Sequence, residues 1–291
     1  MALAPPGGFR LMGILNVTPD SFSDGGRYLR PHAAIEHGAR LFAEGADIVD
    51  VGGESTRPGA EAVSAAQELA RVRPVVEALA AHAGTAISID TSKASVAAAA
   101  LDAGASLVND VSAFRADPEM AALVADRDAD CILMHMRGEP RTMQEDPRYA
   151  DVVDDVKAFL DERLAFALRE GVREERVLLD PGIGFGKTLE HNLELLRRLS
   201  ELSELGRPIV IGTSRKSFLG RIEAGARGLA QPPGSDARLP GTLASNVLAF
   251  ERGASVFRVH DVAPVREALT VAAATLGGGW TARSTQTTPT S

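Results

Sequence analysis

The sequence predicts an α/β protein that folds as a single (β/α)8 TIM barrel. A short apolar run ending on a polar residue recurs eight times, and stretches with helical spacing separate most of these runs. Buried parallel strands read as continuous Val, Ile and Leu runs, and their alternation with helices indicates parallel βαβ units. Polar residues at all eight strand ends favour a closed barrel over a doubly wound open sheet, which concentrates its site at one switch point. Because barrel enzymes carry their chemistry at the carboxyl ends of the strands, the pattern also locates the active site.

The expected strands follow one another in order, each with its polar end. The first four are LMGILN, ADIVDVG, AISID and SLVND, with polar residues at Asn16, Asp50, Asp90 and the pair Asn109 and Asp110. The last four are CILMH, VLLD, PIVIGTS and SVFRVH, with His135, Asp180, Ser214 and His260. Helices are expected at about 31–44, 64–82, 93–103, 117–127, 150–170, 189–203, 240–252 and 261–276.

Four of the expected strands are introduced by nearly the same turn. Gly45, Gly104, Gly171 and Gly253 each follow a helical stretch and lead into the next strand. Glycine is the preferred residue after the last turn of a helix, because it adopts the left-handed conformation without a steric penalty. These positions therefore indicate helix-to-strand connections of one kind.

The length and composition fit one globular unit. The chain has 291 residues, slightly above the roughly 250 typical of one such barrel, and no linker divides it. We expect one domain over 1–280 and a disordered polar tail over 281–291. The amino terminus, MALAPPGGFR, has no apolar signal core, and no apolar run reaches the about 18 residues of a membrane span. These features predict a cytoplasmic protein without a membrane partner.

Net charge and cysteine content exclude several classes of function. The formal charge of -8 leaves no electrostatic footprint for nucleic acid, so any anion site must be built locally. The single cysteine, Cys131, excludes an intrachain disulfide, and its apolar surroundings predict a buried thiol rather than a nucleophile. The sequence also lacks a His and Cys cluster of the kind that binds zinc.

Three connecting segments are long for this architecture. Segments 17–30 and 136–149 follow the first and fifth strands and are rich in Pro, Gly and charged residues. Long loops of this kind commonly serve as lids or binding elements. Segment 224–239 is expected to be a flexible insertion with no chemistry of its own.

Several strand ends carry groups that suit an anion. The motif GTSRKSF, from Gly212, places Ser, Arg and Lys at a strand end and a helix start, where backbone N–H groups and the helix dipole favour negative charge. ESTRPG, from Glu54, and RVHD, from Arg258, add cations and hydroxyls at two further ends. Each motif alone could be a capped helix or a solvated surface, but their occurrence on one rim favours an anion site.

Acceptor groups gather at other strand ends. Asp90, Asn109 and Asp180 end apolar strands, and buried polar groups require partners. Loop amides could satisfy them, or they could together bind the edge of a flat heterocycle. PGIGFGKT, from Pro181, lacks the first glycine of a phosphate loop, but its tight turn lets the backbone approach a flat ligand. Asn16 and Asp24 offer hard oxygen ligands that suit magnesium, although Asp24 could be a simple turn residue.

Eight motifs follow one another from about Leu11 to Val262: ILNVTPDSFSDGG, DVGGESTRPG, SIDTSK, VNDVSA, LMHMRGEPRTMQ, LLDPGIGFGK, GTSRKSFLGR and RVHDV. In this order, they resemble the motifs of the dihydropteroate synthase family of pterin-binding TIM barrels. The resemblance implies a magnesium-dependent transferase of folate biosynthesis that acts as a homodimer and is a target of sulfonamides. The implied reaction condenses 6-hydroxymethyl-7,8-dihydropterin pyrophosphate with p-aminobenzoate, giving 7,8-dihydropteroate and pyrophosphate.

The resemblance also implies roles for individual residues. The expected pterin-binding and catalytic residues are Asp90, Asn109, Asp180 and Lys216, with pocket walls from Met134, Phe185 and Gly212. The expected pyrophosphate residues are Thr56, Arg57, Arg258 and His260. Phe22 and Ser217 would contribute to the p-aminobenzoate site, and Asn16 and Asp24 to the magnesium site. His135 is expected to give structural support rather than to take part in catalysis.

Two other functions are compatible with a pterin-binding barrel. One is a methyltetrahydrofolate-dependent methyltransferase that acts with a corrinoid partner, but such a protein has no need of the SFSDGG, SRKSF and RVHD elements. The other is a non-catalytic pterin-binding paralogue, against which the complete set of rim residues argues. An assay of pyrophosphate release separates the synthase from both.

Overall fold

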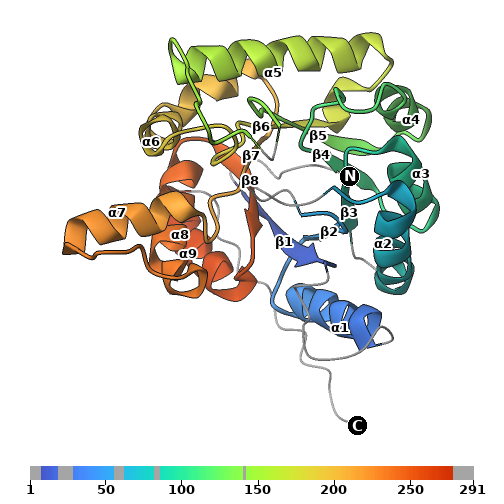
Figure 1. Cartoon of the computed structure of the whole chain (residues 1–291), viewed down its shortest axis with the longest axis horizontal. Coiled ribbons are helices and arrows are strands. Elements are labelled where there is room, and N and C mark those ends of the chain that lie inside the picture. The colour runs from blue at the N-terminus through green and yellow to red at the C-terminus, as the bar shows by residue number, and fades with distance from the viewer. Residues whose placement is uncertain (1–7, 19–28, 56–61, 82–85, 140–141, 278–291) are drawn as a thin grey trace.

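The protein is a closed barrel of eight parallel strands surrounded by helices (Figure 1). The structure, a computed structural model, describes residues 8–18, 29–55, 62–81, 86–139 and 142–277. The strands are β1 (Arg10–Asn16), β2 (Ile48–Gly52), β3 (Ala86–Asp90), β4 (Leu107–Asp110), β5 (Asp130–Met134), β6 (Val177–Asp180), β7 (Ile209–Ile211) and β8 (Ala254–Val259). Each strand pairs in parallel with the next, and β8 closes the barrel on β1. All eight predicted strands are confirmed.

The helices lie outside the strands. They are α1 (Leu29–Ala43), α2 (Ala65–Ala80), α3 (Ala94–Asp102), α4 (Met120–Asp126), α5 (Val152–Arg169), α6 (Leu189–Arg197), α7 (Ser217–Arg227), α8 (Leu239–Glu251) and α9 (Val262–Thr275). Three short 3-10 helices, η1 (Glu174–Arg176), η2 (Leu199–Leu205) and η3 (Ser235–Arg238), complete the described elements. Within the described residues, no helix is both long enough and apolar enough to cross a membrane.

The interior of the barrel begins with a floor of apolar side chains, one from each strand. These are Met12, Ile48, Ala86, Leu107, Ile132, Leu178, Val210 and Val256, all buried. Because side chains alternate across a strand, the residues two positions further on share the inward face. The second layer is therefore Ile14, Asp50, Ser88, Asn109, Met134, Asp180, Gly212 and Arg258. The change from apolar to polar between these layers places the site above the floor.

The repeated glycines have the predicted role. Gly45, Gly104, Gly171 and Gly253 have φ angles of 103°, 109°, 93° and 96°, a region that L-residues with a side chain rarely adopt. Each follows the end of a helix and precedes a strand. The prediction of one kind of helix-to-strand turn is thus confirmed.

The expectation of a flexible insertion over 224–239 is wrong for most of its length. Residues up to Arg227 continue α7, which buries Phe218, Leu219 and Ala224, and η3 follows. Gly220 and Gly225 lower the intrinsic helix propensity of this stretch, so burial of its apolar face overrides a weak local signal. The expected helix over 189–203 is also divided, because α6 ends at Arg197 and η2 continues from Leu199.

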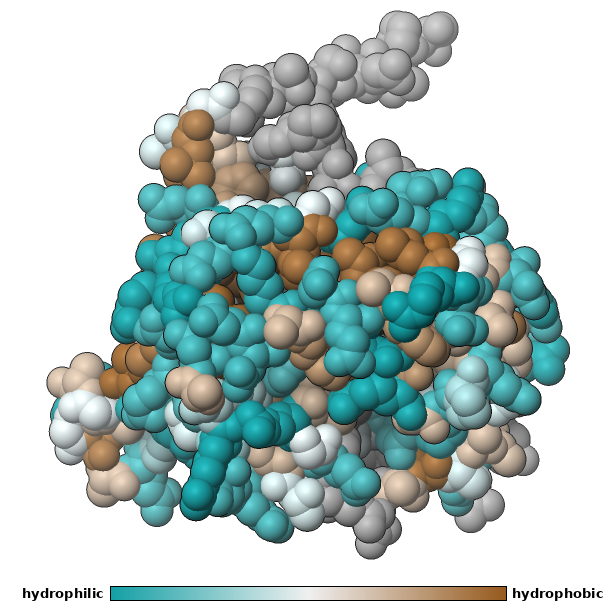
Figure 2. Space-filling model, turned by 90° about the horizontal axis from the view of Figure 1, so that it is seen from above, coloured by the Kyte–Doolittle hydropathy of each residue, from teal (hydrophilic) through white to brown (hydrophobic). Residues whose placement is uncertain are grey.

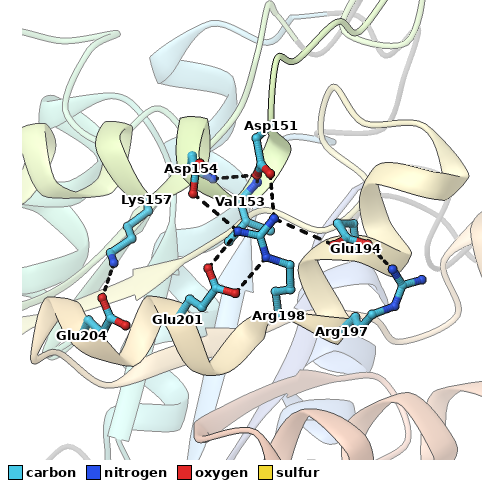
Figure 3. A network of polar contacts seen from close by, with 9 residues as sticks. All are labelled: Asp151, Val153, Asp154, Lys157, Glu194, Arg197, Arg198, Glu201 and Glu204. Carbon is cyan, nitrogen blue, oxygen red and sulfur yellow. Dashed lines mark hydrogen bonds and ion pairs between the residues drawn. The ribbon is translucent and has the colours of Figure 1, made fainter.

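A surface network joins α5 to the α6–η2 segment (Figure 3). Arg198 contacts four carboxylates, those of Asp151, Asp154, Glu194 and Glu201, and Asp151 also caps α5 by accepting from the backbone N–H groups of Val153 and Asp154. The face of the molecule that carries α5 is mainly hydrophilic (Figure 2). This network therefore holds neighbouring elements of the outer layer together in contact with water.

Candidate active site

A pocket lies at the carboxyl ends of the strands. Every strand except β2, or the loop that follows it, supplies lining residues, and Asp50 of β2 contacts two of them. Its lining consists of Ile14, Asp90, Asn109, Val111, Met134, Asp180, Phe185, Gly212, Ser214, Lys216, Arg258 and His260. Nine of these residues are predicted pterin or pyrophosphate residues, and the fold brings them together from six strands and their following loops. The structure therefore has a pocket at the carboxyl ends of the strands, where the sequence predicted the active site.

An arginine and two carboxylates form the charged centre of the pocket. Arg258 Nε donates to Asp50 Oδ2 at 2.6 Å, and Arg258 Nη2 donates to Asp90 Oδ2 at 2.6 Å. Burial raises the pKa of Asp90 to about 7, against the attraction of Arg258. Burial lowers the pKa of Arg258, but the attraction of Asp50 and Asp90 outweighs it, so the guanidinium remains charged. The site therefore holds a fixed cation beside a carboxyl group that titrates near neutrality.

Asn109 lies beside this centre and faces the pocket. Its amide Nδ2 donates to Asp50 Oδ2 at 3.1 Å. This bond fixes the orientation of the amide, because only its nitrogen can donate to a carboxylate. The side-chain oxygen and the remaining N–H of Asn109 are then available to a ligand that carries both a donor and an acceptor.

Asp180 and Lys216 occupy the other side of the pocket. Asp180 Oδ1 accepts from Gly182 N at 2.7 Å, and Lys216 Nζ donates to the carbonyl oxygen of Ile183 and lies 4.6 Å from the ring centroid of Phe185. Burial raises the pKa of Asp180 and lowers that of Lys216 to about 8. A carboxylate, an ammonium group and an aromatic ring thus surround one space, which suits a polar heterocycle.

The glycine-rich turn after β6 is held from below by a buried lysine. Lys187 Nζ donates to the carbonyl oxygens of Gly182 and Phe185, both at 3.0 Å, and contacts His135 Nδ1 at 2.8 Å. Gly182 has a φ of 66°, and a Cβ there would lie 1.9 Å from the His135 carbonyl oxygen, so glycine is required. His135 packs edge-on against Phe159 and lies outside the pocket lining, which supports its predicted structural role.

The rim of the pocket near β7 and β8 carries a hydroxyl and an imidazole. Ser214 Oγ lies 3.0 Å from His260 Nδ1 and accepts from His260 N at 3.1 Å. Arg215, the next residue, adopts a φ of 57° and binds both oxygens of Asp261, which fixes the turn that carries Lys216. Such a rim can bind an anion above the charged centre.

The remaining predicted residues are either outside the described part of the chain or absent from the pocket lining. Thr56, Arg57, Phe22 and Asp24 fall outside the described residues. Ser217 is the first residue of α7, where it is exposed and does not line the pocket. Asn16 ends β1 four residues after the floor residue Met12, so it lies on the inward face above the pocket wall rather than in the lining.

Sequence reasoning missed four residues of this site. Ile14 and Val111 line the pocket, but an apolar residue at a strand end looks like ordinary core. Ser214 was predicted within the anion-binding motif GTSRKSF and Asp50 as a polar strand end, but neither was assigned to the substrate site. A signal for Asp50 did exist, since a charged residue inside the run IVDVG has to be paired when it is buried.

The fold and the pocket together define a class of protein. A (β/α)8 enzyme whose pocket is lined by amide and carboxylate groups together with cations is suited to bind a flat heterocycle that bears an anionic group. The buried cysteine is unrelated to this chemistry, because burial raises the pKa of the Cys131 thiol above its ordinary value.

Comparison with known proteins identifies the family within this class. The family described as pterin binding enzyme matches residues 12–260. The chain is 50% identical to dihydropteroate synthase of Mycobacterium leprae over 96% of both chains, and 45% identical to that of Escherichia coli over 91% of both. The structure resembles Xanthomonas albilineans dihydropteroate synthase with 4-aminobenzoic acid, with a TM-score of 0.85 and 46% identity over 92% of this chain and 93% of that one. It also resembles the same enzyme in complex with 7,8-dihydropteroate, with a TM-score of 0.82 and 43% identity over 92% and 94% of the two chains.

These matches cover the whole barrel and far exceed what a shared fold alone would give. The chain belongs to the dihydropteroate synthase family of pterin-binding enzymes. None of these matches favours the corrinoid-dependent methyltransferase.

Proposed function

We propose that this protein condenses 6-hydroxymethyl-7,8-dihydropterin pyrophosphate with p-aminobenzoate to give 7,8-dihydropteroate and pyrophosphate. The observation that carries the proposal is that one pocket is lined both by Asp90, Asn109, Asp180 and Lys216 and by Arg258 and His260. One group of residues suits the pterin and the other suits its anionic leaving group. The membership of the chain in the dihydropteroate synthase family supports this function.

The lower part of the pocket would bind the pterin. Asp180 and Asn109 offer acceptors and donors to the amino and amide edge of the ring, and Asp90 lies beside Asn109 on the neighbouring strand. Met134 and Phe185 supply apolar walls, and Gly212 leaves room for the flat ring. Lys216, held by Ile183 O beside the Phe185 ring, would donate to a ring acceptor.

The upper part of the pocket would bind the pyrophosphate. Arg258 and His260 lie at the end of β8, and we expect Thr56 and Arg57 to join them. Arginine suits this role because its planar fork matches phosphate oxygens and its charge persists at all working pH values. Preorganised cations stabilise the charge that develops on the leaving group.

Magnesium would complete the leaving-group site. Asn16 supplies one hard oxygen on the inward face of β1, and Asp24 is expected to supply a second. A donor set of this size fits magnesium, which keeps several waters and takes substrate phosphate oxygens as further ligands. When bound, the ion would supply additional neutralisation of the pyrophosphate charge.

The reaction needs no nucleophile from the protein. The bond between the pterin methylene carbon and the pyrophosphate oxygen breaks, and its electron pair leaves with the pyrophosphate. The amine of p-aminobenzoate forms the new C–N bond and loses one proton. The carboxylates of Asp90 and Asp180 stabilise the positive charge that develops on the pterin, and exclusion of water protects it from hydrolysis.

The p-aminobenzoate site is expected at the mouth of the pocket. Ser217 begins α7, a helix of 11 residues whose backbone N–H groups and dipole favour a carboxylate at that end. Phe22 is expected to contact the aromatic ring of this substrate. A protein that binds p-aminobenzoate in this way should also bind sulfonamides, which are its mimics.

We also propose that the protein is a cytoplasmic homodimer. Leu193, Ile222 and Leu248 are exposed large apolar side chains on the neighbouring helices α6, α7 and α8. Such residues on adjacent outer helices suit a subunit interface. Size-exclusion chromatography with light scattering should give twice the mass of the chain, and Leu248→Glu should lower it.

The direct test is an assay of pyrophosphate release. With both substrates and magnesium, pyrophosphate should be released in step with dihydropteroate formation, and omission of p-aminobenzoate should abolish the steady release. If pterin binds measurably but no turnover above background occurs, the non-catalytic paralogue would be the better account.

A further inference from the structure

Asp50 lies directly behind the active-site pocket and is fully buried. It sits in the middle of β2, in the second layer of the barrel, and is absent from the pocket lining. A ligand in the pocket therefore does not touch it. Asp50 can therefore affect the reaction only through the pocket residues that it contacts, Arg258 and Asn109.

Two pocket residues from opposite sides of the barrel meet at one oxygen of Asp50. Oδ2 accepts from Arg258 Nε at 2.6 Å and from Asn109 Nδ2 at 3.1 Å. The other oxygen, Oδ1, is buried and has no hydrogen-bond partner among the described residues. The charge of Asp50 is therefore balanced by Arg258, and separation of the two would leave a buried carboxylate without a counter-charge.

The second contact of Arg258 is of a different kind. Nη2 donates to Asp90, which lines the pocket and keeps 10% of its side chain exposed, whereas Asp50 keeps none. A pterin that donates hydrogen bonds to Asp90 can replace this contact, because the carboxylate then gains a new partner. No ligand in the pocket can replace Asp50 in the same way. The two ends of the guanidinium thus differ in how readily they change partners.

We propose that Asp50 is a positioning residue that holds Arg258 at Nε while its Nη2 end passes from Asp90 to the pyrophosphate as the pterin enters. Asp50 keeps the guanidinium aimed at the leaving group without contact to any substrate. Since the same oxygen fixes the amide of Asn109, one carboxylate aligns the pterin-binding amide with the pyrophosphate-binding arginine. The inference rests on the assignment of Arg258 to the pyrophosphate in the proposed function.

A ratio of two dissociation constants tests this role. The Kd of 6-hydroxymethyl-7,8-dihydropterin is divided by the Kd of its pyrophosphate ester, both measured by calorimetry with magnesium and without p-aminobenzoate. Loss of a hydrogen bond to a charged group should lower this ratio about tenfold in Asp50→Ala. Asp50→Asn keeps an acceptor oxygen but loses the charge, so its ratio should fall less, by about threefold.

Asp110 provides the matched control. It is a fully buried carboxylate at the end of the neighbouring β4, but it accepts from Ser92 Oγ, Ser112 N and Phe114 N and has no contact with Arg258. Asp110→Asn should leave the ratio unchanged even where it lowers the Tm. A double-mutant cycle adds a readout that general destabilisation does not give, since Asp50→Ala should cause no further fall of the ratio in an Arg258→Ala background.

The outcomes separate the inference from the proposed function. If Arg258→Ala itself leaves the ratio unchanged, the assignment of Arg258 to the pyrophosphate is wrong, and the role of Asp50 is overturned with it. If Arg258→Ala lowers the ratio but folded Asp50→Ala and Asp50→Asn do not, the role of Asp50 is overturned and the function stands. If Asp50→Ala does not fold, Asp50→Asn alone decides in the same way.

Discussion

Arg258 and Arg198 each form ion pairs with more than one carboxylate, Arg258 inside the barrel and Arg198 on the surface. Arg258 in the barrel and Arg198 on the surface expose similar fractions of their side chains, 22% and 27%. Their partners differ in exposure. Asp50 and Asp90 expose 0% and 10% of their side chains, whereas Asp154 and Glu201, which lie beside Arg198 in Figure 3, expose 71% and 38%. Burial of the partners, and not the number of ion pairs, separates the two networks.

This difference decides what each network can do. Charges that face water are screened and their interactions are weak. Arg198 can therefore link α5 to η2, but it cannot strongly stabilise charge on a bound ligand. Buried carboxylates are desolvated, and their interactions with a fixed cation are strong and specific. Burial raises the pKa of Asp90, and the attraction of Asp50 and Asp90 keeps Arg258 charged against the effect of its own burial. Substitutions in each network separately test this difference between buried and solvated ion pairs.

The largest effect is expected for Arg258→Ala. Removal of one preorganised group that stabilises the leaving-group charge should lower kcat/KM about 10²- to 10³-fold. Steady-state rates of pyrophosphate release measure this effect. A loss smaller than about tenfold in a folded variant would contradict the assigned role.

The next effect concerns Lys216 and the pH dependence of the reaction. Burial raises the pKa of Asp90 to about 7 and lowers that of Lys216 to about 8. The reaction needs Asp90 ionised and Lys216 charged, so kcat/KM should rise with pH near 7 and fall again near 8. Lys216→Met should lower the rate about 10²-fold and remove the decline at high pH. Persistence of that decline in Lys216→Met would assign it to another group.

A smaller effect, on stability alone, is expected for Lys187→Met. The buried side-chain nitrogen of Lys187 donates to two carbonyl oxygens of the turn after β6, and methionine cannot replace these bonds. Gly182 O keeps its hydrogen bond from Phe185 N, but Phe185 O loses the Lys187 donor, so the substitution should cost about 1–3 kcal/mol of unfolding free energy. Urea denaturation measures this cost, and an unchanged midpoint would show that the turn is held by other contacts.

The smallest effect is expected for Arg198→Ala. The partners of Arg198 are mostly solvated, so kcat/KM should remain within about twofold of the parent value and the Tm should fall by at most a few degrees. Parallel assays with Arg258→Ala give the comparison directly. A large loss of activity in Arg198→Ala would mean that the outer layer positions the site.

Most of the fold could be predicted from the sequence because its signals are local. Eight apolar runs with polar ends, and glycines such as Gly45 and Gly253 after helices, follow from strand burial and backbone sterics alone. The start of α7 was predicted, but its extent to Arg227 was not, because Gly220 and Gly225 weaken its local propensity and its stability comes from packing in the folded chain.

The site was only partly predictable, because contacts between residues far apart in the sequence leave no local pattern. The polar strand ends identified Asp90, Asn109, Asp180 and Arg258 as neighbours, since the carboxyl ends of barrel strands meet on one rim. Asp50 was predicted as a polar strand end, but its contact with Arg258 was not, because the two are 208 residues apart and no local pattern joins them. The roles of Thr56, Arg57, Phe22 and Asp24 remain predictions from the family resemblance.

The central claim is that one pocket binds the pterin and the pyrophosphate with two separate sets of residues. The most direct measurement is the binding of the pterin with and without its pyrophosphate to Asp180→Asn and to Arg258→Ala. We predict that Asp180→Asn weakens both ligands by the same factor, whereas Arg258→Ala weakens only the pyrophosphate ester strongly. Equal losses for both ligands in both variants would contradict the division of the pocket.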